Sequence, residues 1–274
     1  MLLASGLGLP ESPRWRDGRL VFSDVWAQRL VAVDDDGNQA LLADLPDRPS
    51  GLGWLPDGRL LVVLMRQRRL VAWADGIVDA VIDLAAASAD LLNELIVHPA
   101  GHVYVGDFRF PDDDGPRTSG LLRVDVDTRT ATRVATGLYA PNGMAITPDG
   151  GTLIVAETGA RRLTAFTVRD DGSLADQRLW APLDFAPDGI CMTDGGAVWV
   201  ASPQAPSACR LIAPGGAVME TLNSDDGQAA FACVLGGTDR QTLYRCEAPY
   251  PTTPDDRRGR VVASRSTSTG AGWP

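Results

Sequence analysis

Six positions along the chain share one place in a repeated pattern, and four of them have residue types that suit the binding of a hard divalent cation. The residues at this place, from the first copy of the pattern to the sixth, are Glu11, Ser50, Asn93, Asn142, Asp188 and a residue within Phe231 to Cys233. Carboxylate and carboxamide oxygens are the ligands that calcium, magnesium and manganese prefer, and zinc also accepts carboxylates. The pattern predicts one divalent metal ion (Ca, Mg, Mn or Zn), with Glu11, Asn93, Asn142 and Asp188 as its ligands.

Glu11 is the member of this set that local turn chemistry explains least well. Asn, Asp and Ser often cap turns or begin strands without binding anything, whereas glutamate is poor in that role. Glu11 also lies between Pro10 and Pro13, whose fixed φ angles limit the freedom of the backbone around it. We therefore expect Glu11 to be held rigidly as a metal ligand.

The elements that must position these residues are short strands joined by glycine turns. The copies begin at residues 11, 50, 93, 142, 188 and 231, so that successive starts are 39 to 49 residues apart. Each copy contains two strands around a turn such as PDG, PAG or DGG, which is a strong hairpin signal, and two further strands usually follow. Four strands at this period are typical of a propeller blade. The sequence predicts an all-β fold, a six-bladed β-propeller with four antiparallel strands per blade, formed by a single domain over residues 1–274.

The propeller prediction has three local consequences. Residues that open the innermost strand of each blade should meet at the mouth of the central channel. The segment Gly259 to Thr267 should pair with the amino-terminal region, because an open ring would leave unpaired sheet edges. Helical periodicity is scarce, and DLAAASADLLNE, residues 83–94, is the one candidate helix.

Composition excludes several classes of function. The chain of 274 residues has 45% hydrophobic residues and a formal net charge of −10, which disfavours nucleic acid and anionic membrane surfaces as partners. No apolar run approaches the ~18 residues of a membrane span, and no secretory signal is recognisable, so a cytoplasmic location is expected. Two histidines cannot form a three-histidine metal centre, and no G-x-S-x-G motif is present. A small-molecule substrate is the expected partner; the oligomeric state is left open.

Several of the repeated segments resemble those of a known family. The segments LPESPRW, APNGMAITPDGGTLIVAET, APDGICMTDGGAVWVA and FACVLGG look like the senescence marker protein (regucalcin), gluconolactonase and luciferin-regenerating-enzyme family, over essentially the whole chain. The resemblance implies a six-bladed propeller with one divalent metal at the channel mouth, and many members hydrolyse lactones. It implies that Glu11 and Asn142 are ligands, that Asp188 is both a ligand and the general base, and that Asn93 lies near the metal and the substrate.

The chain departs from the family pattern around Asn93. It reads Glu94 and Leu95 where an acidic residue and a glycine usually follow the asparagine. Leu91 stands where sugar lactonases have an arginine that grips substrate hydroxyls, so a highly polar sugar lactone is disfavoured. Phe108 and Arg109, with Phe110 in the same segment, are expected to lie over the substrate as a lid.

Together with this resemblance, these residues lead us to expect metal-dependent hydrolysis of a lactone or a related cyclic ester. The metal would polarise the carbonyl, Asp188 would take a proton from water, and Asn93 would help to stabilise the oxyanion. Two alternatives stay open. One is a metal-dependent biosynthetic enzyme of the same fold, such as a cyclase, an isomerase or a carbon–carbon bond-forming enzyme. The other is a non-catalytic propeller that binds calcium or other proteins.

Overall fold

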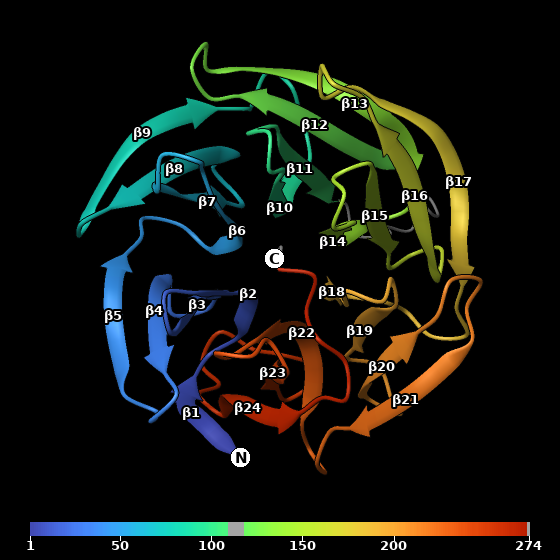
Figure 1. The fold of residues 1–274 in the computed structure, drawn as a ribbon. Helices are drawn as coiled ribbons and strands as arrows, with labels where there is room; N and C mark the ends of the chain where they lie inside the picture. The colour runs from blue at the N-terminus through green and yellow to red at the C-terminus, as the bar shows by residue number, and fades with distance from the viewer. Residues whose placement is uncertain (109–117, 273–274) are drawn as a thin grey trace.

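A computed structural model describes residues 1–108 and 118–272, and in it six four-stranded antiparallel sheets surround a central channel (Figure 1). Blade 1 consists of β2 (Pro10–Arg16), β3 (Arg19–Asp24), β4 (Arg29–Asp34) and β5 (Gln39–Asp44). Blade 2 consists of β6 (Pro49–Trp54), β7 (Leu60–Leu64), β8 (Arg69–Ala74) and β9 (Ile77–Asp83). Blade 3 consists of β10 (Leu91–Val97), β11 (Val103–Phe108), β12 (Ser119–Asp125) and β13 (Thr130–Leu138).

The remaining blades complete the ring. Blade 4 consists of β14 (Pro141–Ile146), β15 (Thr152–Glu157), β16 (Arg162–Val168) and β17 (Leu174–Pro182). Blade 5 consists of β18 (Ile190–Met192), β19 (Val198–Ser202), β20 (Ala208–Ile212) and β21 (Val218–Asn223). Blade 6 consists of β22 (Ala229–Gly236), β23 (Thr242–Ala248), β24 (Gly259–Arg265) and β1 (Leu2–Leu7). The predicted six-bladed β-propeller with four antiparallel strands per blade is confirmed.

Strand composition follows the distance of each strand from the central axis. The inner strand β14 and the second strand β19 are buried along their whole length, whereas the outermost strands β5 and β21 are mostly exposed. A strand covered on both faces reads as a continuous run of small and apolar residues, and a strand open to water on one face carries polar residues. The sequence pattern within each repeat therefore sets which strand lies inside.

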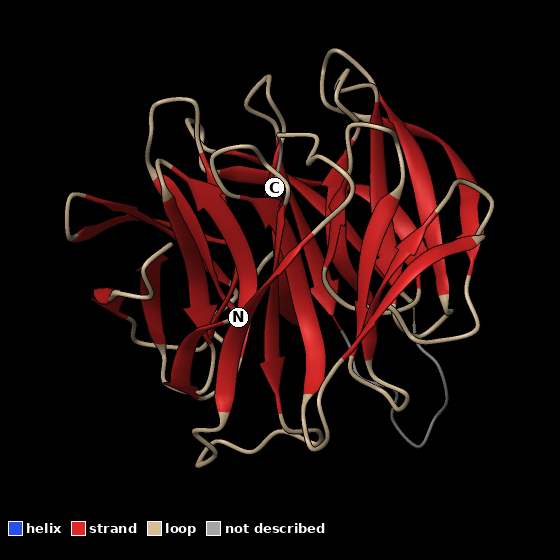
Figure 2. Ribbon diagram, turned by 60° about the horizontal axis from the view of Figure 1, so that its bottom comes forward, coloured by secondary structure: helices blue, strands red, loops and turns tan. Residues whose placement is uncertain are grey.

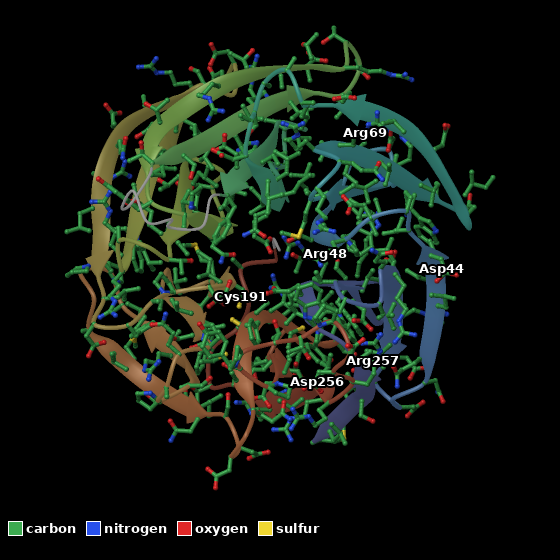
Figure 3. The ribbon with its side chains drawn as sticks, turned by 180° about the vertical axis from the view of Figure 1, so that it is seen from behind. Asp44, Arg48, Arg69, Cys191, Asp256 and Arg257 are labelled. Atoms are coloured by element: carbon green, nitrogen blue, oxygen red, sulfur yellow. The ribbon has the colours of Figure 1, made fainter. Side chains whose placement is uncertain are left out.

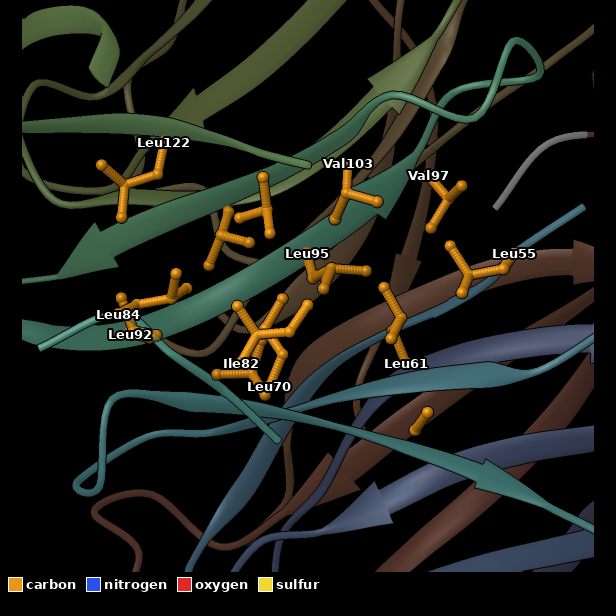
Figure 4. Packing of buried hydrophobic residues seen from close by; sticks show 14 residues of the cluster. Leu55, Leu61, Leu70, Ile82, Leu84, Leu92, Leu95, Val97, Val103 and Leu122 are labelled. Atoms are coloured by element: carbon orange, nitrogen blue, oxygen red, sulfur yellow. The ribbon is translucent and has the colours of Figure 1, made fainter. Parts of the chain in front are cut away.

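The hydrophobic core lies between neighbouring blades. One cluster joins Leu61 and Leu70 of blade 2 to Leu95, Val103 and other residues of blade 3 (Figure 4). Similar clusters join each of the other neighbouring pairs, including blade 6 to blade 1. Burial between faces stabilises the ring by about 25 cal/mol for each Å² of apolar surface removed from water, so the blades are held in place by one another.

Blade 6 is built from both ends of the chain. Strand β1 pairs with β24, with Leu2 opposite Val262 and Ala4 opposite Val261. The predicted pairing of Gly259 to Thr267 with the amino-terminal region is therefore confirmed. In Figure 1 the blue first strand lies beside the red last strand.

The candidate helix at residues 83–94 was wrong. Within it, backbone bonds from Ala87 and Ser88 to the carbonyl of Leu84 form a single turn, and the chain then enters β10. Leu92 and Leu95 are fully buried between blades, so tertiary packing overrides the helix propensity of the alanines. Figure 2 shows strands and loops throughout. None of the described segments is a helix of the length and hydrophobicity required to cross a membrane.

Candidate active site

The polar residues at the start of each repeat lie at one end of the innermost strands. Glu11, Asn93 and Asn142 belong to β2, β10 and β14, and Asp188 lies two residues before β18. Each of the three strands has a register shift at the polar residue: it begins at Glu11 in β2 and includes Asn93 in β10 and Asn142 in β14. Such bulges bend a strand and change the direction of its side chains, and they are common beside active sites.

Glycines next to these residues allow the inner strands to come close together. A Cβ atom on Gly143 would lie 2.5 Å from the nitrogen of Ile190 and 2.6 Å from the carbonyl oxygen of Asp188. A Cβ on Gly51 would lie 2.1 Å from the nitrogen of Leu95. Real Cβ atoms do not approach backbone so closely, so the Ser-Gly and Asn-Gly pairs are required by the narrow centre of the ring.

A chain of hydrogen bonds connects the inner ends of blades 2 to 5. Ser50 Oγ donates to Asn93 Oδ1 at 3.0 Å, and Asn93 Nδ2 donates to Asn142 Oδ1 at 3.1 Å. Asn142 Nδ2 donates to Thr158 Oγ1 at 3.2 Å, and the Thr158 hydroxyl donates to the carbonyl oxygen of Pro187 at 2.8 Å. We call this chain of residues the polar relay (Ser50, Asn93, Asn142, Thr158, Pro187). Each of its first four members donates to the next, so all four hydrogen bonds run in the same direction around the ring. The relay fixes the oxygen of each amide and ends beside Asp188.

Of the two candidate carboxylate ligands, Asp188 is buried and Glu11 is half-buried, and the environment of each disfavours its charged form. Burial raises the pKa of Glu11 well above its usual range, and the charge of Asp188 raises it further. Burial and the charge of Glu94 raise the pKa of Asp188 to about 8, while Asn142 acts in the opposite direction. Carboxylates that are forced together out of water in this way are typical of functional sites.

Below these residues the channel is filled by an interaction that the sequence did not predict. Glu94 accepts a hydrogen bond from Ser12 Oγ and lies 3.7 Å from the guanidinium of Arg14. Arg14 also donates to the carbonyl oxygens of Leu52 and Leu95, both at 2.9 Å. The cavity left among these side chains measures ≈ 10 Å³, the space of about one water molecule, so a substrate must enter from the mouth.

The donor set of the site fits a hard divalent cation. It consists of two carboxylates, Glu11 and Asp188, and the amide oxygens of Asn93 and Asn142, without sulfur or imidazole. Among residues 1–108 and 118–272 no three His, Cys, Asp or Glu side chains are grouped to hold a metal ion. The candidate set has only two carboxylates, and its other two members are amides. The raised pKa values of Glu11 and Asp188 mean that ionising both carboxyls at this place is unfavourable for the protein alone.

The other residues singled out from the sequence have varied positions. Leu91 opens β10 and is half-buried, and Phe108 ends β11 and is buried. Arg109, like Phe110, lies outside the described residues, so the expected lid stays a prediction. His98 and His102 lie in the turn between β10 and β11, where their Nε2 atoms contact the carbonyl oxygens of Gly150 and Asp170.

Comparison with known proteins gives one consistent family. Residues 9–247 match the model of the SMP-30/Gluconolactonase/LRE-like region. The pentonolactonase XacC of Haloferax volcanii is 30% identical over 251 residues, which cover 86% of this chain and 80% of that protein. The lactonase drp35 of Staphylococcus epidermidis is 24% identical over 196 residues, or 68% of this chain; the match spans only 60% of that relative's length. A solved gluconolactonase from Xanthomonas campestris superposes with a TM-score of 0.77 at 26% identity, covering 96% of this chain and 89% of that one.

Proposed function

The chain belongs to the SMP-30/gluconolactonase/LRE-like family, and on that premise we propose that it hydrolyses a lactone or a related cyclic ester with one divalent metal ion. The relatives named above, a pentonolactonase, a lactonase and a gluconolactonase, support the reaction class. The observation that carries the proposal for this chain is the buried Asp188 carboxyl, whose pKa is raised to about 8 beside the amide of Asn142.

The ligands of the metal in this proposal are Glu11, Asn142 and Asp188, with Asn93 beside them. A cation held there supplies Lewis-acid polarisation of the lactone carbonyl and lowers the pKa of water.

The side chains themselves handle the proton and the developing charge. Asp188 in its ionised form accepts the proton of the attacking water, and burial makes this carboxylate a stronger base than one in water. Asn93 Nδ2 has two hydrogens and uses one for Asn142 Oδ1. Its second hydrogen is assigned to the oxygen that becomes negative in the tetrahedral intermediate. The relay through Ser50 and Thr158 holds both amides in this orientation.

The walls of the mouth favour a substrate that is not a highly polar sugar lactone. Leu91 offers no hydrogen-bond donor from blade 3. On the side of blades 1 and 6, Leu9, Val25 and Phe231 form a buried apolar cluster against which Trp26 and Met65 pack. A sugar ring would lose hydrogen bonds with water against the half-buried Trp26 and Met65, whereas an apolar ring gains by burial.

A panel of lactones assayed with purified protein tests the proposal. Aliphatic, aromatic and sugar lactones are incubated with protein that has been treated with a chelator and then resupplied with calcium, magnesium, manganese or zinc. We expect ring opening that is lost on chelation and restored by at least one metal, with aliphatic or aromatic rings preferred. Activity that survives chelation would refute the metal-dependent mechanism, and a preference for gluconolactone would refute the assigned polarity.

Labelled water separates hydrolysis from the other chemistry that this scaffold can hold. Hydrolysis in ¹⁸O water transfers one labelled oxygen into the hydroxy acid. A cyclase or isomerase would release product without that label. Turnover with no ¹⁸O in the product would therefore replace hydrolysis with metal-dependent isomerisation or bond formation.

A further inference from the structure

Arg48 is a cation at the mouth of the channel that the proposed mechanism does not use. It lies between β5 and β6, two residues before Ser50, and its guanidinium carbon is 4.3 Å from the centroid of the Trp26 ring. Figure 3 shows Arg48 close to the central opening, whereas Asp44 and Arg69 lie towards the outside of the ring.

Other arginines on the same side of the ring are paired with buried carboxylates. Arg29 lies 2.9 Å from Asp24, and Arg162 lies 2.7 Å from Glu157. Each of these arginines opens the third strand of its blade, and its partner ends the second strand. These ion pairs leave both charges balanced inside the protein.

Arg48 has no such partner among the described residues. The neighbouring Asp47 is committed to the backbone, because its carboxylate accepts hydrogen bonds from the nitrogens of Arg66 and Gln67 at 2.8 Å each. Burial lowers the pKa of Arg48, and the nearby charge of Arg66 lowers it further. The indole nitrogen of Trp26 is also buried without an acceptor in the described part of the chain. The charge of Asp47 acts on Arg48 in the opposite direction, but no carboxylate forms an ion pair with Arg48 among the described residues of a chain whose net charge is −10.

Backbone contacts connect Arg48 to the candidate catalytic residues. The nitrogen of Met65 donates to the carbonyl oxygen of Arg48 at 3.0 Å, and the nitrogen of Leu92 donates to the carbonyl oxygen of Met65 at 3.2 Å. Leu92 directly precedes Asn93. Arg48 is therefore held at the edge of the wall that leads down to the relay, on an apolar surface formed by Trp26 and Met65.

We propose that Arg48, stacked on Trp26, binds a carboxylate substituent of the lactone substrate. This inference rests on the proposed function and names its substrate class: a lactone with a largely apolar ring and one acidic group, which hydrolysis converts to a hydroxy dicarboxylate. A guanidinium is planar, stays charged and matches a carboxylate with two parallel hydrogen bonds, and stacking on an indole orders it before the substrate arrives. Leu91 on blade 3 carries no positive charge, and Arg48, directly before blade 2, provides one.

The test compares two substrates that differ only in charge. The γ-lactone of 2-hydroxyglutarate carries a free carboxylate, and its methylamide is neutral and of similar size. Steady-state rates and calorimetric binding of both compounds are measured for the wild type, Arg48→Met, Arg48→Lys and Arg69→Met. Arg69 is the matched control, because it pairs with Asp83 on outer strands far from the opening.

For Arg48→Met we expect KM and Kd for the charged lactone to rise at least ~10-fold, as for loss of a charge-assisted hydrogen bond, with kcat nearly unchanged. Values for the methylamide should stay within about twofold, Arg48→Lys should restore part of the loss, and Arg69→Met should behave as wild type. Equal effects on both compounds, or none, would overturn the subsite.

Binding and turnover separate the two proposals. Arg48-dependent binding of the charged lactone without any ring opening would leave the subsite standing and reject hydrolysis. If both lactones are hydrolysed and their Kd values are the same for Arg48→Met and the wild type, hydrolysis stands and the Arg48 subsite is rejected.

Discussion

Asn93 Nδ2 donates a 3.1 Å hydrogen bond to Asn142 Oδ1, so the inner strands of blades 3 and 4 are joined by their own candidate ligands. The bond decides which atom of Asn142 faces the centre of the ring. Its oxygen points towards Asn93, and its nitrogen is used on Thr158. The orientation of the Asn142 amide oxygen thus depends on Thr158. The hydroxyl of Thr158 could bind a cation only by giving up its hydrogen bonds in the relay.

Thr158→Val removes the acceptor that fixes the Asn142 amide. We expect metal affinity and kcat to fall about 10-fold, the lower end of the effects of losing a residue that orients a ligand, because the amide becomes free to turn its nitrogen inward. Calcium or manganese titration by calorimetry measures the change. Thr221→Val on the exposed strand β21 is the matched control and should bind the metal as wild type does; equal affinity in both variants would contradict the role of the relay.

Asp188→Asn keeps the shape of the side chain and removes its capacity to accept a proton. We expect kcat for lactone hydrolysis to fall at least ~10²-fold, as is typical for loss of a general base. Rates are measured at saturating metal, so that weaker binding of the cation does not dominate the result. Asp184→Asn changes an exposed carboxylate in the same loop and should retain activity. Near-wild-type turnover by Asp188→Asn would assign the base elsewhere.

The same carboxyl predicts how the stability of the metal-free protein depends on pH. The pKa of Asp188 is raised from its ordinary value of 3.8 to about 8, so between these limits the folded chain holds a proton that the unfolded chain releases. The contribution of Asp188 to stability is therefore complete below pH 3.8 and is lost as the pH rises towards 8. Urea unfolding in chelator from pH 5 to pH 8 should show a steeper decline for the wild type than for Asp188→Asn. Parallel declines would mean that Asp188 is already ionised in the folded chain.

Gly143→Ala tests the close packing of the inner strands. The added Cβ would meet the backbone at Ile190 and Asp188 at about 2.5 Å, so blade 4 must move away from blade 5. We expect a loss of about 1–3 kcal/mol in the free energy of unfolding, as for other overpacked sites, with reduced metal affinity because Asp188 shifts. Gly195→Ala places a methyl group in a turn at an ordinary contact distance of 3.9 Å from Thr193 Oγ1 and serves as the control. If Gly143→Ala and the wild type unfold at the same denaturant concentration, the inner strands of blades 4 and 5 can move apart without loss of stability, which contradicts the prediction.

Local signals in the sequence were sufficient for the architecture. Turns such as PDG and PAG require positive φ at their glycines, as at Gly58 and Gly101, and they identify hairpins without knowledge of the rest of the fold. Repetition then supplies the blades, and closure places Glu11, Asn93, Asn142 and Asp188 at one end of the channel. The prediction of a helix at residues 83–94 was wrong. The alanines have high helix propensity, but the leucines that follow them pack between two blades as part of a strand.

The side-chain interactions between blades could not be predicted from these local sequence signals. Glu94 looked like a disturbance of a family motif, yet it is held by Ser12 and Arg14, which are some 80 residues away in the sequence. Ser12 reaches it from a left-handed conformation with φ of 51°, which no serine signals by its type. Thr158 lies in a turn of blade 4, and its place in the relay depends on Pro187 in the loop before blade 5. Contacts of this kind follow from the spacing and tilt of neighbouring blades, which the repeat period does not specify.

The pairing of β1 with β24 also sets an order of events during synthesis. The strand that bears Glu11 leaves the ribosome early, yet the blade that must cover one of its sides is the last to be made. A growing chain therefore keeps a bare sheet edge and an incomplete set of ligands through most of translation. Competence to bind the cation should come in one late step, when the first and last strands of the molecule meet.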